Sequence, residues 1–286
     1  MKKILMLFLC VATLLVAGCD KFAKEKDAIT KAEKIAMATE LPPLVKPDFT
    51  KQPRPSRQEI ENAWKKYRED LDKFVEAEEK ILDEMRKSDV RIAEMEKKAE
   101  NDSEKKNLQE FKEKVLKERI EFVKKVSKGR LYGDTFIVGV GSTWQEVEMV
   151  FGKPPNEQIK NSAFKEYKYD GIKFEDHIGG GVPPKEILMK WVSKSVQCVF
   201  LTGSDITSDT GIKIGMTDDE VFKTLKSKYV NKGIDLKDEM FVGQGFAGRK
   251  DYTELIVGYS TKETLPYNMF VSFKDGKLTK YVVAPH

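Results

Sequence analysis

The chain has 286 residues, which is enough for about two domains. Charged residues make up 34% and hydrophobic residues 40%, a composition that excludes a disordered chain and a multi-span membrane protein. Lys and Arg number 51 against 47 Asp and Glu, and this near-balance argues against a dedicated nucleic-acid binder. With two His and three Cys, a Cys/His zinc cluster is hard to assemble. We therefore expect no nucleic-acid partner, no metal and no cofactor.

The N-terminal segment is typical of a bacterial secretory signal. Two lysines at 2–3 precede an apolar run at 4–16, which is short for a transmembrane helix of about 20 residues. The run ends in Leu-Val-Ala-Gly-Cys at 15–19, which resembles the lipobox of bacterial lipoproteins. The resemblance implies that residues 1–18 are a signal peptide and that Cys19 is the site of lipid attachment.

Lipidation would decide where the protein resides. Two or more acyl chains of the palmitate type, at about 0.8 kcal/mol per buried CH₂, anchor a protein durably. We expect a lipid-anchored protein of the cell membrane or outer membrane that faces the extracytoplasmic side. An ordinary cleaved signal with an incidental Cys19, or an uncleaved N-terminal anchor, is the alternative. Cys198 is then the single free cysteine, so no intrachain disulfide forms, and it is expected to be a small buried residue.

Residues 19–55 are expected to form a Pro-rich tether. The Lys/Glu/Ala-rich stretch at 20–40 favours a partly helical segment. Five prolines then follow within 14 residues, which forbids a continuous helix or central strand. An extended tether would lift the folded parts off the membrane.

Residues 56–129 form the second region, which is predicted to be helical. Ser56 and Glu59 make an S-x-x-E capping box. Apolar residues then recur at alternating spacings of four and three, so ten of twelve seam positions are apolar, Glu78 and Ser88 being the other two. Such a seam has to pack against another helix. The apolar seam positions are Ile60, Trp64, Tyr67, Leu71, Phe74, Ile81, Met85, Ile92, Met95 and Ala99.

The polar segment at 101–103 interrupts this pattern and contains a second helix start signal. We predict a coiled-coil-like antiparallel hairpin of 56–100 against 103–128. One long helix that self-associates as a dimeric coiled coil is the alternative. Because the second arm is shorter, part of the first helix needs another cover, from the third region or from a partner. Either arrangement makes this region a spacer or docking element.

The third region, 131–286, changes to short alternating strands and is predicted to be α+β. Segments 167–174 and 270–278 each indicate a β-hairpin with an Asp-Gly turn. Residues 140–147 recur as 214–221, an offset of 74 residues with Gly, Thr, Glu and Val identical at equivalent places. Each copy carries a helix capping box, Thr143 with Glu146 and Thr217 with Glu220. This indicates tandem helix-plus-antiparallel-sheet units at about 131–205 and 206–286.

The first copy resembles the G-x-T-x-x-x-V-x-x-x-x-G-x-P segment of the SmpA/OmlA (BamE-like) envelope lipoproteins. The second copy keeps Gly215, Thr217 and Val221 but has Lys226 and Lys228 in place of the later Gly and Pro. The tandem arrangement is also similar to the β-lactamase-inhibitor-protein fold. These resemblances imply an α+β fold that acts through protein contacts rather than through chemistry. The matched residues of the first copy are Gly141, Thr143, Val147, Gly152 and Pro154.

Candidate chemical motifs are weak. Residues 243–248 satisfy G-x-G-x-x-G, but a strand rather than a helix follows, so a flexible loop is expected. Glu175, Asp176 and His177 are interpreted as surface loop residues, since neighbours on a strand point to opposite faces. Ser204 lacks the second glycine of a nucleophile elbow. Trp144, Trp191 and Phe270 are expected in the core rather than in a ligand platform.

These observations predict no catalytic residue and a protein that is not an enzyme. We expect an envelope lipoprotein that acts as a scaffold or protein-binding component, with a partner the sequence does not identify. The alternatives are an envelope hydrolase, which needs an acid–base pair in a deep cleft, and an inhibitor-like module acting on an extracytoplasmic enzyme. An exposed apolar or aromatic patch on the sheet face would favour binding.

Overall fold

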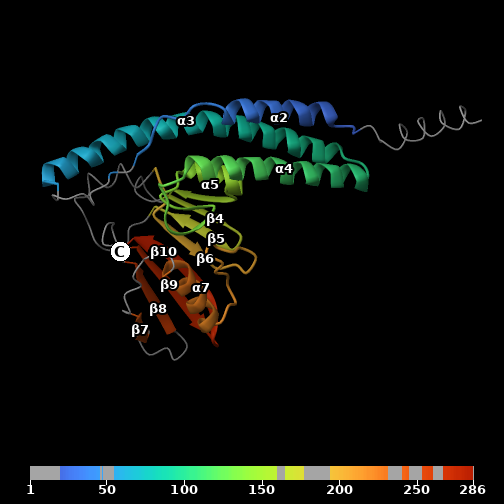
Figure 1. Ribbon diagram of the computed structural model, residues 1–286. Helices are drawn as coiled ribbons and strands as arrows, with labels where there is room; N and C mark the ends of the chain where they lie inside the picture. Colours follow the sequence, from blue (N-terminus) through green and yellow to red (C-terminus); the bar gives the residue numbers. More distant parts are fainter. Residues whose placement is uncertain are drawn as a thin grey trace, which may run out of the picture. The chain divides into compact units, whose positions relative to one another are not determined.

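The fold was analysed in a computed structural model (Figure 1). The chain divides into two compact units, Met1–Thr39 with Asp83–Glu118, and Glu40–Leu82 with Arg119–His286. Parts of both long helices, residues before 83 and after 118, thus fall in the same unit as the α+β region. The structure describes residues 20–45, 47, 55–159, 165–176, 194–230, 240–244, 253–259 and 267–285.

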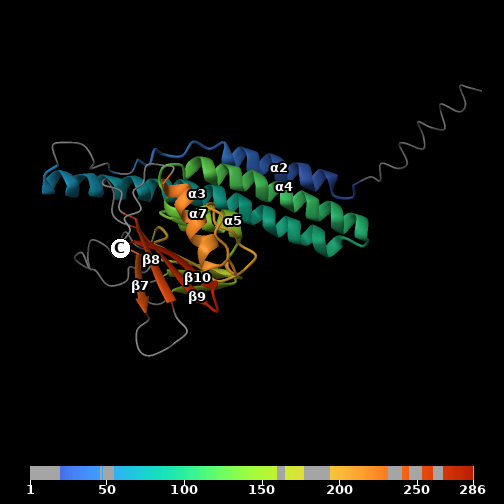
Figure 2. The ribbon, with the colours of Figure 1, turned by 60° about the horizontal axis from the view of Figure 1, so that its bottom comes forward.

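The first unit is a three-helix bundle. Helix α2 (Ala23–Met37) runs alongside α4 (Figure 2) and covers the adjoining parts of α3 (Arg57–Lys98) and α4 (Asp102–Val126). Its Ile29 is fully buried in a cluster with residues of all three helices. The partly helical segment expected at 20–40 therefore contains a helix, Ala23–Met37, that packs on the hairpin. The core cluster is Phe22, Ile29, Ile92, Met95, Leu108, Phe111 and Val115.

The predicted helical hairpin is confirmed. At the start of α3 the backbone N–H of Glu59 donates to Ser56 Oγ (3.3 Å), and the Ser56 N–H donates to Glu59 Oε2 (2.7 Å). The helix ends at Lys98, and α4 begins after Asn101, whose side chain accepts a hydrogen bond from the N–H of Glu104 (2.9 Å). These caps explain why the chain turns instead of continuing as one helix.

The second unit contains an eight-stranded antiparallel sheet. Its strand order is β3-β4-β5-β6-β10-β9-β8-β7, so two four-stranded meanders meet where β6 pairs with β10. A separate pair, β1 with β2, precedes α5 (Trp144–Phe151), and α7 (Asp218–Val230) precedes the second meander. The strands are β1 (Tyr132–Phe136), β2 (Val138–Val140), β3 (Asn156–Ile159), β4 (Lys165–Tyr169), β5 (Ile172–Glu175), β6 (Cys198–Leu201), β7 (Met240–Gln244), β8 (Thr253–Tyr259), β9 (Tyr267–Lys274) and β10 (Lys277–Pro285).

The internal repeat is also structural. Gly141 and Gly215 have nearly the same positive φ, 94° and 93°, which favours glycine at both places. Each capping-box threonine also makes an antiparallel bridge near the last strand of its own meander, Thr143 with Ser195 and Thr217 with Lys277. The repeated sequence therefore builds two equivalent junctions between a helix start and a sheet.

The two Asp-Gly hairpins form as predicted but are not equivalent. The turn at Asp170-Gly171 joins β4 to β5, the second and third strands of the first meander. The turn at Asp275-Gly276 joins β9 to β10, the third and fourth strands of the second meander. Both residues of the latter turn have positive φ, 52° and 70°, as a type I′ turn requires.

Buried Asp134 of β1 links the β1–β2 pair to the last strand of the second meander and to the segment before α7. Its Oδ2 accepts a hydrogen bond from the Tyr281 hydroxyl of β10 (2.9 Å), and its Oδ1 accepts one from the N–H of Thr210 (3.1 Å). Burial raises the pKa of Asp134, an effect that these hydrogen bonds oppose. Asp134 thus accepts hydrogen bonds from two residues that lie far later in the sequence.

Candidate functional site

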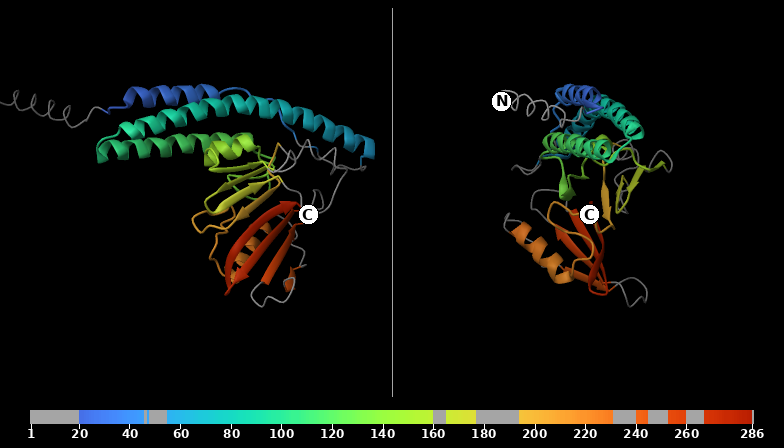
Figure 3. Two further views of the ribbon diagram at one scale, coloured as in Figure 1. Left: turned by 180° about the vertical axis from the view of Figure 1, so that it is seen from behind. Right: turned by 90° about the vertical axis from the view of Figure 1, so that its right-hand side faces the viewer.

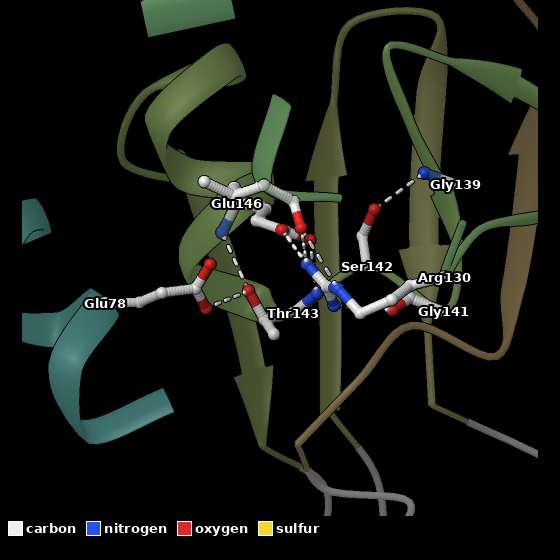
Figure 4. Close-up of polar contacts among 8 residues, drawn as sticks. Glu78, Arg130, Gly139, Gly141, Ser142, Thr143 and Glu146 are labelled. Atoms are coloured by element: carbon white, nitrogen blue, oxygen red, sulfur yellow. Dashed lines mark hydrogen bonds and ion pairs between the residues drawn. The ribbon is translucent and has the colours of Figure 1, made fainter. Parts of the chain in front are cut away.

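A buried polar junction connects α3 to the start of α5 (Figure 4). The Thr143 hydroxyl donates to Glu78 Oε2 at 2.7 Å, and it accepts a hydrogen bond from the N–H of Glu146 at 3.1 Å. Glu146 completes the capping box, since its Oε2 accepts from the N–H of Thr143 at 3.0 Å. The junction therefore extends the helix cap by one further residue, supplied by the long helix.

Arg130 supplies the positive charge of this junction. Its guanidinium forms an ion pair with Glu146, donates to the carbonyl oxygen of Gly141 (3.4 Å) and lies 4.7 Å from the ring centroid of Phe74. The Arg130 side chain is 3% exposed and that of Glu146 is 0% exposed. Solvent and substrates therefore do not reach these groups.

Two carboxyl groups, those of Glu78 and Glu146, lie near the buried Arg130 guanidinium. Burial, and then the nearby Glu146 carboxylate, raise the pKa of Glu78 well above its ordinary value. Burial also raises the pKa of Glu146, although Arg130 acts in the opposite direction. Glu78 Oε1 has no hydrogen-bond partner among the described residues. We assign the proton to Glu78 and the ion pair to Arg130 and Glu146, which leaves the junction without net charge.

Two further contacts join the same face of α3 to the first α+β half. Glu79 Oε2 accepts a hydrogen bond from the Gln145 side chain at 2.7 Å, and Asp72 pairs with Lys194. Asp72, Phe74, Glu78 and Glu79 span two turns of α3. This arrangement fixes the helix against the sheet unit, and its burial suits it to support rather than to catalysis.

The polar positions in the apolar seam of α3 point to this junction in the sequence. Glu78 and Ser88 are the two polar positions of the α3 seam, and both are buried. Ser88 is satisfied locally, because its hydroxyl donates to the carbonyl oxygen of Glu84 at 3.1 Å. Glu78 instead accepts a hydrogen bond through its Oε2 from Thr143, which lies far away in the sequence. Of the two polar seam residues, the charged Glu78 therefore indicates a tertiary contact, whereas Ser88 does not.

The other candidate residues of the sequence fall in several places. Cys198 is buried, as predicted, and burial followed by the Glu175 carboxylate raises the pKa of its thiol to about 12. Trp144 is a core residue, also as predicted. Ser204 is exposed and its hydroxyl contacts the adjacent Asp205 (3.2 Å). Cys19, His177, Trp191 and most of the glycine-rich segment 243–248 lie outside the described residues.

The interpretation of Glu175 and Asp176 as surface loop residues was wrong. Glu175 ends β5 and pairs with Lys173, and both acidic residues are buried. Asp176 continues the ladder, since its N–H donates to the carbonyl oxygen of Lys165 (3.1 Å) and its Oδ1 accepts from the N–H of Lys165 (2.6 Å). The carboxylate of Asp176 therefore helps to hold the start of β4 against the end of β5. The residues next to Asp176 in the sequence do not indicate this contact.

The two faces of the sheet differ. One face carries the core and packs on α5, with Trp144 against Tyr167 and Phe151 against Phe174. On the opposite face, Phe200, Val282 and Phe270 are direct neighbours in register across β6, β10 and β9. Figure 3 (left) looks onto this face, with α7 behind β9 and β10. Among the described elements of the second unit, no helix covers it.

Lysines flank the aromatic row on this helix-free face. The Nζ atoms of Lys173 and Lys280 lie 4.2 and 5.4 Å from the ring centroid of Phe200. Lys168 is next to Lys173 in register and is exposed. Phe200 and Phe270 are both partly exposed, and Phe270 thus differs from the core position expected for it. A row of aromatic and apolar residues with lysines at its side is suited to contact a protein surface.

Comparisons of the chain with family models, with curated proteins and with solved structures find no match. Within the described ranges, no group of three or more His, Cys, Asp or Glu side chains is arranged to hold a metal ion. None of the described helices combines the length and apolar character needed to cross a bilayer.

Proposed function

We propose that this chain is a lipid-anchored extracytoplasmic lipoprotein that binds a protein partner in the bacterial envelope through the helix-free face of its sheet. The observation that carries the binding function is the pair of partly exposed rings Phe200 and Phe270, which lie on either side of buried Val282. The lipobox-like segment that ends at Cys19 supports the anchor. The buried junction at Glu78 supports a role in scaffolding, because within the second unit it ties the part of α3 before residue 83 to the start of α5.

The composition of the face indicates the chemistry of the partner. Lys173 is already paired with Glu166 and Glu175, whereas Lys168 is exposed at the margin. We expect the partner to place apolar side chains over Phe200 and Phe270 and a carboxylate near Lys168. Aromatic residues contribute most to such interfaces, while charges at the rim mainly affect the association rate.

Site-specific photo-crosslinking in the cell envelope tests the binding function. A photoreactive amino acid is placed at Phe200 or Phe270, and at exposed Ser204 as the matched control. We expect the same protein to be captured from the two aromatic positions and not from the control. Phe270→Asp should then abolish capture from position 200. Equal capture from all three positions, or none from the aromatic ones, would exclude this face as the interface.

Mass spectrometry of the mature N-terminus tests the anchor. We expect a diacyl or triacyl modification on Cys19 and removal of residues 1–18, with Cys19→Ser leaving a soluble or uncleaved precursor. A bare amino terminus, or membrane partitioning that Cys19→Ser does not change, would exclude lipidation. This measurement does not depend on the sheet face, so the proposed anchor and the proposed binding site are tested separately.

A further inference from the structure

The start of α2 is fastened to the turn between α3 and α4. Lys21 Nζ donates to the carbonyl oxygen of Lys98 (3.0 Å) and to Glu100 Oε1 (2.9 Å). Lys26 Nζ contacts the carbonyl oxygen of Asn107 at 3.1 Å. Phe22 between them is only 4% exposed, in the core cluster of the first unit. Several contacts thus hold the first residues of the described chain at one end of the bundle.

Covalent geometry limits how far Cys19 can be from this end. Consecutive Cα atoms are about 3.8 Å apart, so the Cα atom of Cys19 lies at most about 11 Å from that of buried Phe22. Asp20 is itself tied back, because its Oδ1 accepts from the N–H of Phe22 (3.0 Å) and its Oδ2 pairs with Lys26 (2.8 Å). The proline-rich residues come after α2 and therefore do not separate Cys19 from the bundle.

We infer that the three-helix bundle meets the lipid bilayer end-on, with the α3–α4 turn at 99–104 against the headgroups. This inference rests on the proposed lipidation of Cys19. The glyceryl group of a lipidated cysteine sits at headgroup level, and the headgroup layer is about 5–7 Å thick on each side. A link of three residues is too short to hold the end of the bundle at a distance from the headgroup layer.

The charges near the turn indicate that the covalent link, rather than lipid charge, holds this contact. Segment 97–106 has four lysines and three acidic residues, and Lys21 and Asp20 add one of each, so the described residues at this turn form no polybasic patch that would select anionic lipids. We therefore expect the same apposition on neutral and on acidic membranes. The residues are Lys97, Lys98, Lys105 and Lys106, with Glu100, Asp102 and Glu104.

Fluorescence quenching in vesicles tests the inference. Asn101→Cys at the turn and Thr39→Cys beyond the other end of α2 are each labelled with a fluorophore in the lipidated protein, where Cys19 is acylated and Cys198 is buried. The two sites are separated by a helix of 15 residues, or about 22 Å. Vesicles of phosphatidylcholine, with or without phosphatidylglycerol, carry a headgroup-linked nitroxide. We expect quenching at position 101 that exceeds quenching at position 39 at least threefold, in both lipid mixtures.

A spacer provides the matched control. Insertion of about 20 Gly/Ser residues between Cys19 and Asp20, a coil that spans roughly 25 Å, should relieve the quenching at position 101. Mass spectrometry of the same samples reports acylation separately. An acylated protein with equal quenching at both positions, or with none at position 101, would overturn the end-on contact and leave the lipoprotein proposal intact. An unacylated Cys19 would instead remove the proposed anchor.

Discussion

Glu78 of α3 and Thr143 at the start of α5 are 65 residues apart in sequence, yet they share a hydrogen bond of 2.7 Å in the interior. The second copy of the repeat contains the same capping box, with Thr217 and Glu220, but that box is exposed. The repeated motif therefore serves two purposes. It caps a helix in both copies, and in the first copy its threonine also donates a hydrogen bond to Glu78 of α3.

This difference predicts unequal costs for the same substitution in the two copies. Thr143→Val removes a helix cap and leaves the Glu78 carboxyl without its donor, so we expect a loss of about 2–4 kcal/mol in unfolding free energy. Thr217→Val, the matched control, removes only an exposed cap and should cost about 1 kcal/mol. Urea unfolding followed by tryptophan fluorescence measures both, because all three tryptophans belong to the second unit. Equal losses would contradict a special role for the first cap.

The buried carboxyl pair predicts a pH dependence. The folded protein raises the pKa of Glu78 above its ordinary 4.5, so the unfolded chain releases this proton first. The stabilising contribution of protonated Glu78 is complete below pH 4.5 and decreases as the pH rises through the raised pKa. The neighbouring titratable groups are Glu146, Arg130 and Tyr67, and burial raises the pKa of both Glu146 and Tyr67.

Glu78→Gln isolates this effect, because a glutamine mimics the protonated acid at every pH. Its unfolding free energy should match the parent protein within about 0.5 kcal/mol at pH 4 and exceed it by about 1–2 kcal/mol at pH 8. Glu78→Ala, which leaves a cavity and no acceptor for Thr143, should be less stable at both values. A Glu78→Gln protein that lost stability steadily from pH 5 to pH 8, in parallel with the parent, would show that Glu78 does not hold the proton.

Helix α2 contributes to the core of the first unit through fully buried Ile29. Ile29→Ala should cost about 2–5 kcal/mol, and amide hydrogen exchange in α2 should accelerate accordingly. Ile35 lies on the same helix with 73% of its surface exposed, so Ile35→Ala should change stability by less than about 0.5 kcal/mol. If both substitutions had the same small effect, α2 would not be packed on the hairpin.

The close approach of Gly171 and Gly203 predicts a steric effect. A Cβ atom on Gly203 would lie 2.4 Å from the Cα atom of Gly171, a backbone contact that a side-chain rotation cannot relieve. We expect Gly203→Ala to destabilise the second unit by about 2–3 kcal/mol. Gly139→Ala is the milder comparison. Its Cβ would meet Thr135 Cγ2 at 2.9 Å, which rotation relieves, and Thr135 Cβ at 3.2 Å, which needs only a small shift, so we expect a cost of about 1 kcal/mol. Thermal unfolding of the two variants provides the comparison.

Much of the local structure could be predicted because its causes are local. Capping boxes at Ser56, Thr143 and Thr217, Asp-Gly turns and the spacing of apolar residues located the helices and the hairpins within a few residues. The 74-residue repeat likewise indicated two similar units before their strands were known. These features depend on residues that are close in sequence, and the same physical rules apply to them in any fold.

The tertiary structure decided the features that depend on distant partners. Ile29 could be assigned to a core only once α2 lay on the hairpin, and Phe270 only once the sheet showed which face lacked a helix. The pairing of β6 with β10, which joins the two meanders, has no local signal either. Glu78 shows the reason most clearly. Its place in the apolar seam could be found in the sequence, but whether a buried carboxyl is tolerated depends on the hydrogen-bond partners that folding brings to it, here Thr143 from another part of the chain.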